Sequence, residues 1–177
     1  MIEKDFETSL LHGLSQIKVE SSKSQIEKFK MYMQLLLEWN EKMNLTAITE
    51  QSEIITKHFV DSLTIEKHMA QGSSIIDIGT GEGFPGIPLK IIRDDINVTL
   101  LDSLNKRISF LNETIEKLEL QKIKAIHGRA EEMARDRRIQ RTIRCGSIKS
   151  SSSIECFVRI YGAVCENRRK NHLYEGT

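Results

Sequence analysis

The hydrophobic positions of the first seventy residues recur at helical spacing. Residues 3–17 place apolar side chains three or four positions apart, which predicts a first helix. A serine at position 21 or 22 can cap a second, longer helix, and residues 52–69 predict one or two more after a turn at 44–46. The stripe of the second helix is typical of a core-facing surface and consists of Ile26, Phe29, Met33, Leu36 and Trp39. Residues 1–70 are therefore predicted to form an N-terminal helical cap.

From residue 71 the pattern changes to short apolar runs that alternate with amphipathic segments. The runs at 75–78, 96–101 and 123–126 predict strands, and the segments at 84–92 and 103–119 predict helices, with a further helix starting at residue 129. Nearly continuous apolar strands separated by helices predict a parallel sheet that is covered on both faces. We therefore predict an α/β fold over residues 71–138, with the βαβαβ order of an incomplete Rossmann-like sheet.

After residue 138 neither periodicity continues, and only residues 157–164 keep the pattern of a strand. Residues 139–177 carry 7 Lys+Arg and 3 Asp+Glu, whereas residues 1–138 carry 19 against 22. This stretch contains all three cysteines, at positions 145, 156 and 165, and their spacing fits no metal-ligand motif. We treat residues 139–177 as an aberrant tail and predict no metal site.

The overall composition excludes few functions. The chain has 177 residues and a formal net charge of +1, which gives no global electrostatic footprint for nucleic acid. No apolar run reaches membrane-spanning length, and residues 1–5 lack the order of a signal peptide. These features predict a cytoplasmic protein that does not associate with a membrane.

The candidate site lies in the segment that joins the first predicted strand to its helix, residues 77–88. Glycines stand at positions 79, 81 and 83, where they permit positive φ and close approach of a ligand to the backbone. The following helix offers unpaired N–H groups at its first turn. A turn without a ligand is the alternative interpretation. A nicotinamide dehydrogenase is disfavoured, because a dinucleotide fingerprint that starts at Gly79 needs glycine where Phe84 stands.

A second candidate is Asp102, which ends the second predicted strand about 20 residues beyond the glycines. An acid at this position accepts hydrogen bonds from ribose hydroxyls. Capping of the next helix is the alternative role. Nucleotide cofactors of several classes use such an acid, so it does not separate one class from another.

Five motifs occur in one order along the chain: Asn40–Thr46, Lys57–Ser62, Asp77–Pro88, Leu101–Arg107 and Arg129–Glu131. Together they resemble the RsmG (GidB) family of bacterial small-subunit rRNA guanine-N7 methyltransferases. The resemblance covers residues 1–138. It implies S-adenosyl-L-methionine as the methyl donor, small-subunit rRNA or a pre-assembled ribosomal subunit as the partner, and a monomer.

The resemblance also implies roles for individual residues. Gly79 and Phe84 are expected to contact the donor, residues 130–131 to border its adenine, and Asp102 to lie near its ribose. The expected cofactor-binding residues are Asp77, Gly79, Gly81, Gly83, Phe84, Asp102, Ala130 and Glu131. No catalytic residue is nominated, because the sulfonium of the donor is strongly electrophilic and guanine N7 already carries a lone pair.

Four further residues of these motifs each leave two interpretations open. His58 and Asp61 either join the helical cap to the sheet or contact RNA or the cofactor. Lys106 and Arg107 either contact phosphate or form a solvated helix face.

The tail departs from the family pattern. The resemblance implies a fourth strand of the type Tyr-Asp-Val-Val and then an Arg-Ala-Val-Ala segment, where this chain has residues 144–151. Codons permitted for residues 139–177 restore both patterns when they are read one nucleotide later, so we predict a frameshift. The first strand would become an exposed apolar edge. We expect a truncated, impaired enzyme; the alternatives are an inactive fragment or a non-catalytic RNA-binding module.

Overall fold

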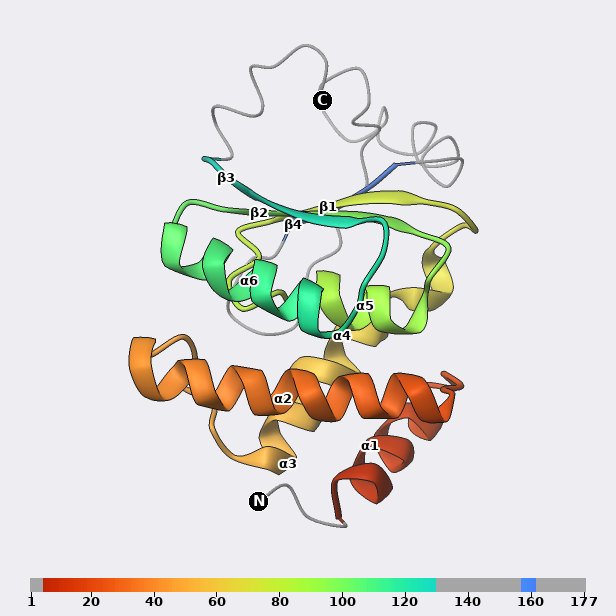
Figure 1. Ribbon diagram of the computed structural model, residues 1–177. Helices are drawn as coiled ribbons and strands as arrows, with labels where there is room; N and C mark the ends of the chain where they lie inside the picture. Colours follow the sequence, from red (N-terminus) through yellow and green to blue (C-terminus); the bar gives the residue numbers. More distant parts are fainter. Residues whose placement is uncertain (1–4, 130–156, 162–177) are drawn as a thin grey trace, which may run out of the picture.

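A computed structural model describes residues 5–129 and 157–161 of the chain. Its elements form three layers, which Figure 1 shows edge-on: a sheet, a pair of helices beneath it, and the N-terminal helices beneath that pair. This arrangement agrees with an incomplete Rossmann-like α/β sheet that carries an N-terminal helical cap. The division of the chain at residues 70 and 138 stays a prediction.

The sheet contains the three predicted parallel strands in the order β3-β2-β1, followed by a fourth strand on the outer side of β1. β1 pairs with β2 from Ser74↔Asn97 to Ile78↔Leu101, and β2 pairs with β3 from Val98↔Ile123 to Asp102↔His127. The carboxyl ends of the three parallel strands therefore meet at one edge of the sheet. The strands are β1 (Ser74–Ile78), β2 (Asn97–Asp102), β3 (Ile123–His127) and β4 (Phe157–Tyr161).

β4 corrects one expectation. The sequence predicted that the aberrant tail would leave the first strand as an exposed edge, and that expectation is wrong for the described structure. β4 pairs antiparallel with β1, with Ser74 opposite Tyr161 and Ile78 opposite Phe157. The backbone groups of β1 thus have partners on both sides, because any extended segment can satisfy them whatever its direction. The strand predicted at residues 157–164 is present over Phe157–Tyr161, and residues 162–164 lie outside the described residues.

Two helices connect the parallel strands. α5 (Gly86–Ile92) follows β1, and α6 (Asn105–Lys117) follows β2. α6 begins two residues later than predicted, because the N–H of Leu104 donates to Asp102 Oδ1 at 2.9 Å and closes a turn first. Both helices lie on the sheet face that is turned toward the cap (Figure 1). The helix predicted from residue 129 lies, beyond Arg129 itself, outside the described residues.

The cap is built from two full helices and a series of short ones. α2 begins at the Ser22 N-cap, where Gln25 completes a capping box, and ends at Asn44 in the left-handed conformation. A seven-residue π-helix stands within the segment predicted as one or two helices, a form that often occurs at functional sites. The elements are α1 (Asp5–Gln16), α2 (Lys23–Met43), α3 (Gln51–Glu53), η1 (Ile54–Val60), α4 (Asp61–Leu63) and η2 (Glu66–His68).

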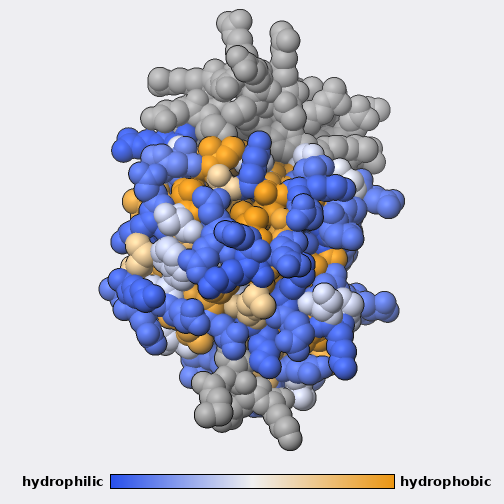
Figure 2. Space-filling view, in the orientation of Figure 1, coloured by the Kyte–Doolittle hydropathy of each residue, from blue (hydrophilic) through white to orange (hydrophobic). Residues whose placement is uncertain are grey.

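The cap and the sheet share one hydrophobic core. A single cluster of buried side chains runs from the predicted stripe of α2 through Phe59 of η1 to Leu100 of β2 and Phe110 of α6. Phe29, Phe59 and Phe110 are fully buried. In the view of Figure 2, hydrophilic residues cover most of the cap, and hydrophobic residues reach the surface mainly in the upper half. Within the described ranges, no helix combines the length and apolarity needed to cross a bilayer.

Candidate functional site

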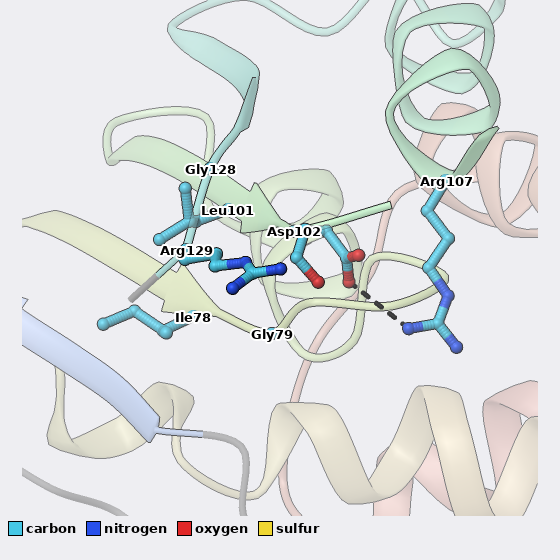
Figure 3. Close-up of a pocket in the computed structure, with 8 residues that line it drawn as sticks. Ile78, Gly79, Leu101, Asp102, Arg107, Gly128 and Arg129 are labelled. Atoms are coloured by element: carbon cyan, nitrogen blue, oxygen red, sulfur yellow. Dashed lines mark hydrogen bonds and ion pairs between the residues drawn. The ribbon is translucent and has the colours of Figure 1, made fainter. Parts of the chain in front are cut away.

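A pocket of about 520 Å³ opens where the parallel strands end. Its walls come from the ends of β1, β2 and β3 and from the first turn of α6 (Figure 3). This is the edge of an open α/β sheet at which ligands bind, outside the carboxyl ends of the strands. The residues that line the pocket are Ile78, Gly79, Leu101, Asp102, Ser103, Arg107, Gly128 and Arg129.

The glycine loop is fastened to the end of β2. The N–H groups of Gly79 and Thr80 donate to the carbonyl of Leu101 at 2.8 and 3.1 Å. The N–H of Gly81 donates to Asp102 Oδ2 at 3.0 Å. Gly79, Gly81 and Gly83 all have positive φ, at 71°, 59° and 102°. The tight turn that the sequence predicted is therefore present and needs glycine for its backbone conformation.

The three glycines differ in what their missing side chains leave room for. A Cβ on Gly79 would have no atom within 4 Å, and one on Gly81 would lie 4.0 Å from Arg107 Nη1. A Cβ on Gly83 would lie only 2.5 Å from Ile87 Cδ1 and 2.9 Å from the Tyr32 hydroxyl oxygen. Gly79 thus faces the open pocket, whereas the space beside Gly83 is filled by the protein itself.

Asp102 connects the loop, α6 and the pocket. Its carboxylate is 3% exposed and accepts hydrogen bonds from the N–H groups of Gly81 and Leu104. It does not act as the N-cap of α6, because that position belongs to Leu104. The backbone carbonyl of Asp102 accepts a further bond from Gly128 at 3.0 Å, which fixes the end of β3 beside it.

Two arginines flank this carboxylate. Arg107 Nη1 lies 3.4 Å from Asp102 Oδ2, and Arg107 Nη2 lies 3.8 Å from Glu82 Oε1. Figure 3 shows the side chain of Arg129 on the other side of Asp102 in that view. Burial raises the pKa of Glu82, and the charge of Arg107 opposes that rise. The interpretation of Arg107 as part of a solvated helix face is therefore wrong, because its side chain pairs with Asp102 and Glu82.

Asp77 lies behind the loop and does not line the pocket. It is fully buried, and its Oδ2 accepts hydrogen bonds from the Thr80 hydroxyl at 2.7 Å and the Gly86 N–H at 3.0 Å. Burial raises the pKa of Asp77 to about 7, against the lowering effect of these two bonds. A Cβ on Gly86 would lie 2.3 Å from Leu100 Cδ2, so glycine here allows α5 to pack closely on the sheet.

Phe84 and His58 lie on the cap side of the loop. The Phe84 ring stacks on the His58 ring at 4.4 Å between centroids and 5° between planes, and it also contacts Tyr32 at 5.5 Å. Phe84 is 8% exposed and is not among the residues that line the pocket. The stacking joins η1 to the glycine loop, as the first interpretation of His58 supposed. The expected contact between Phe84 and a donor stays a prediction.

The structure brings together only part of the predicted site. Gly79 and Asp102 line the pocket, whereas Asp77, Gly81, Gly83 and Phe84 are not among its lining residues. Asp77 supports the loop through the N–H of Gly86, and Gly81 joins the loop to Asp102. Residues 130–131 lie outside the described residues. The sequence did not single out Ser103, Gly128 or Arg129 as pocket residues. The available signal was their position directly after predicted strands, because the ends of parallel strands converge at one edge.

The hydrogen-bonding groups that line the pocket fit a nucleoside. Asp102 Oδ1 accepts one hydrogen bond in the described residues, and a carboxylate oxygen has capacity for two, so a ribose hydroxyl can be the second donor. The open space at Gly79 lets a ligand reach the backbone there. The fold and this pocket together define a Rossmann-like α/β protein with a pocket at the carboxyl ends of β1 and β2, the edge at which open α/β sheets bind ligands.

The family follows from comparison with known sequences. The profile of GidB, rRNA small subunit methyltransferase G, matches residues 25–154. The chain belongs to this family. The match includes the cap from α2 onward, the whole glycine loop and the three parallel strands, and it extends into the predicted aberrant tail.

Individual relatives agree with the family profile. The chain is 55% identical over 130 residues to the ribosomal RNA small subunit methyltransferase G of Lachnoclostridium phytofermentans, covering 72% of this chain and 54% of that protein. It is 53% identical over 129 residues to the protein of the same name from Desulfitobacterium hafniense, covering 73% and 54%. The chain spans about half the length of the curated relatives it matches.

Proposed function

We propose that this chain binds S-adenosyl-L-methionine in the pocket at Gly79 and Asp102 and belongs to an enzyme that methylates N7 of a guanine in small-subunit rRNA. The observation that carries the proposal is the pairing of an open, positive-φ glycine with a buried acid across one pocket. Family membership supplies the reaction class, and the relatives' names supply the substrate class.

The residues of the chain contribute binding and orientation. Asp102 would accept hydrogen bonds from the ribose hydroxyls, and the backbone at Gly79 would allow close approach of the rest of the donor. The bound donor supplies an electrophilic methyl group on a sulfonium. Guanine N7 needs no deprotonation, so holding the two reacting atoms in line provides the main acceleration. A general base is not required, and none is proposed.

The partner is proposed to be small-subunit rRNA, either free or within an assembled ribosomal subunit. Arg129 brings positive charge to the pocket, where an approaching phosphate backbone would be attracted. The charge of Arg107 is shared with Asp102 and Glu82. Monomeric state and a cytoplasmic location stay predictions.

Two matched glycines provide a test. Gly79 and Gly72 have nearly the same φ, 71° and 69°, and a Cβ on either would meet no atom within 4 Å. Alanine at either position should therefore lower the free energy of unfolding by a similar amount, about 1–2 kcal/mol, because a Cβ is unfavourable in the left-handed conformation. Gly79→Ala places its methyl group in the pocket, whereas Gly72 does not line it. We expect Gly79→Ala to weaken donor binding by at least about tenfold, or about 1.4 kcal/mol, and Gly72→Ala to leave it unchanged.

Isothermal titration calorimetry with S-adenosyl-L-methionine measures this difference, and thermal melting shows whether the two variants are equally stable. A wild-type chain that binds no donor but retains rRNA would favour the RNA-binding module instead. Equal losses of affinity in the two variants would show that binding responds to backbone strain and not to the pocket.

A further inference from the structure

We infer that Tyr32, in the helical cap, is a positioning residue that holds the glycine loop in its ligand-binding shape. Tyr32 lies on α2, and its hydroxyl donates to the backbone carbonyl of Glu82 at 2.5 Å. Glu82 stands between Gly81 and Gly83, at the centre of the loop. The inference rests on the proposed function only in what the loop binds, since the contact exists without a ligand.

Tyr32 approaches the loop through the core. Its side chain is fully buried, and its ring lies 5.5 Å from Phe59, 5.5 Å from Phe84 and 6.5 Å from Phe110. These rings come from η1, the loop and α6, so the phenol is held by three elements and has little freedom to turn. Burial raises the pKa of Tyr32 well above its usual value, so its hydroxyl keeps the proton that it donates.

The absence of a side chain at Gly83 agrees with this contact. A Cβ at Gly83 would lie 2.5 Å from Ile87 Cδ1 and 2.9 Å from the Tyr32 hydroxyl oxygen, closer than such atoms approach. Gly83 therefore makes room for Ile87 of α5 and for Tyr32 of the cap, and its positive φ also favours glycine.

The loop is thus held from two sides. Asp102 accepts the N–H of Gly81 on the sheet side, and Tyr32 donates to the carbonyl of the next residue on the cap side. The two bonds fix the N–H of Gly81 and the carbonyl of Glu82. The helical cap consequently takes part in shaping the pocket, although Tyr32 itself does not line it.

The test removes the hydroxyl and keeps the ring. Tyr32→Phe is compared with Thr114→Val, which removes a hydroxyl that is also fully buried but donates to Phe110 within α6. Hydrogen–deuterium exchange in the ligand-free chain is measured at the amides of Gly81 and Gly83 and at those of β2. We expect about five- to tenfold faster exchange at the loop in Tyr32→Phe alone, the factor that one lost hydrogen bond supplies, with β2 unchanged.

Calorimetry with S-adenosyl-L-methionine then connects the loop to binding. Affinity should fall by a similar factor in Tyr32→Phe and remain at the wild-type value in Thr114→Val. Unchanged loop exchange, equal effects in the two variants, or wild-type affinity in a variant with faster loop exchange would each overturn the inference. A wild-type chain that binds no donor would refute the proposed function, while the exchange experiment would still decide the role of Tyr32.

A measurement on the unaltered chain complements the variants should Tyr32→Phe fail to fold. A buried hydroxyl that donates a hydrogen bond exchanges slowly with water, and we expect a nuclear magnetic resonance signal for it with a cross-peak to Gly83. A hydroxyl signal in fast exchange with water would contradict the contact.

Discussion

At the scale of single residues, Asp77 carries the largest consequence for pH. Its ordinary pKa of 3.8 is raised to about 7 in the folded chain, chiefly because the carboxyl group is fully buried. Between these pH values the folded chain holds a proton that the unfolded chain has lost. The stabilising contribution is therefore complete below about pH 4 and is lost as the pH rises to about 7.

Asp77→Asn should remove this dependence, because the amide resembles the protonated acid and can still accept from Thr80 and Gly86. As the pH rises from about 4 to about 7, we expect the wild-type free energy of unfolding to fall relative to the variant. The fall should reach up to about 1.4 kcal/mol per pH unit. Urea unfolding at several pH values across this window measures it; parallel curves for the two proteins would contradict the raised pKa.

At the scale of elements, the first turn of α2 joins the cap to α5, in the helix layer that covers the sheet. Ser22 and Gln25 form a reciprocal capping box, and Gln25 Nε2 also donates to the carbonyls of Ile91 and Ile92 at 3.0 and 3.1 Å. Those carbonyls belong to the last residues of α5. One glutamine thus satisfies the start of one helix and the end of another.

Ser22→Ala should lower the free energy of unfolding by about 1 kcal/mol, the usual cost of losing an N-cap. Gln25→Ala should cost more, because it also removes two bonds to α5. Ser24→Ala is the control, since Ser24 is an exposed residue in the same turn, and alanine there should be neutral or slightly stabilising. Denaturant unfolding ranks the three variants; a Ser24→Ala loss equal to that of Ser22→Ala would argue against the cap.

At the scale of the whole molecule, the strand that lies beside β1 determines whether the ligand site has all the walls of a doubly wound sheet. In a doubly wound sheet the ligand lies where the strand order reverses, beside the first strand. Here an antiparallel strand from residues 157–161 occupies that side. We propose that residues from about 139 onward are a frameshifted translation, and that the original frame would place a parallel strand at this position.

Reading the codons of residues 139–177 one nucleotide later should therefore improve both stability and donor binding. We expect a higher melting temperature and a lower dissociation constant, because the proposed parallel strand would replace the antiparallel β4 beside β1, next to the pocket. Melting and calorimetry compare the frame-restored protein with the 177-residue chain, and sequencing of the locus checks the frame directly. An intact reading frame at the locus, with no insertion or deletion near this point in related genes, would count against the frameshift. Equal affinity for the methyl donor in the two proteins would also count against it.

The sequence by itself determined the local features of this protein. The βαβαβ order, the capping of α2 by a serine at position 21 or 22, the glycine turn and the acid that ends β2 all follow from periodicity and residue type, which act over a few neighbouring positions. Element ends shifted by one or two residues where side chains close turns, as Asp102 does before α6.

Only the tertiary structure decided which residues act together. Gly79 and Gly83 have the same local signature, yet one faces the pocket and the other faces Tyr32, about fifty residues earlier in the chain. The pairing of Arg107 with Glu82 and the antiparallel docking of β4 on β1 are likewise contacts that no local pattern encodes. Periodicity fixes which face of an element is buried, whereas packing fixes what that face meets.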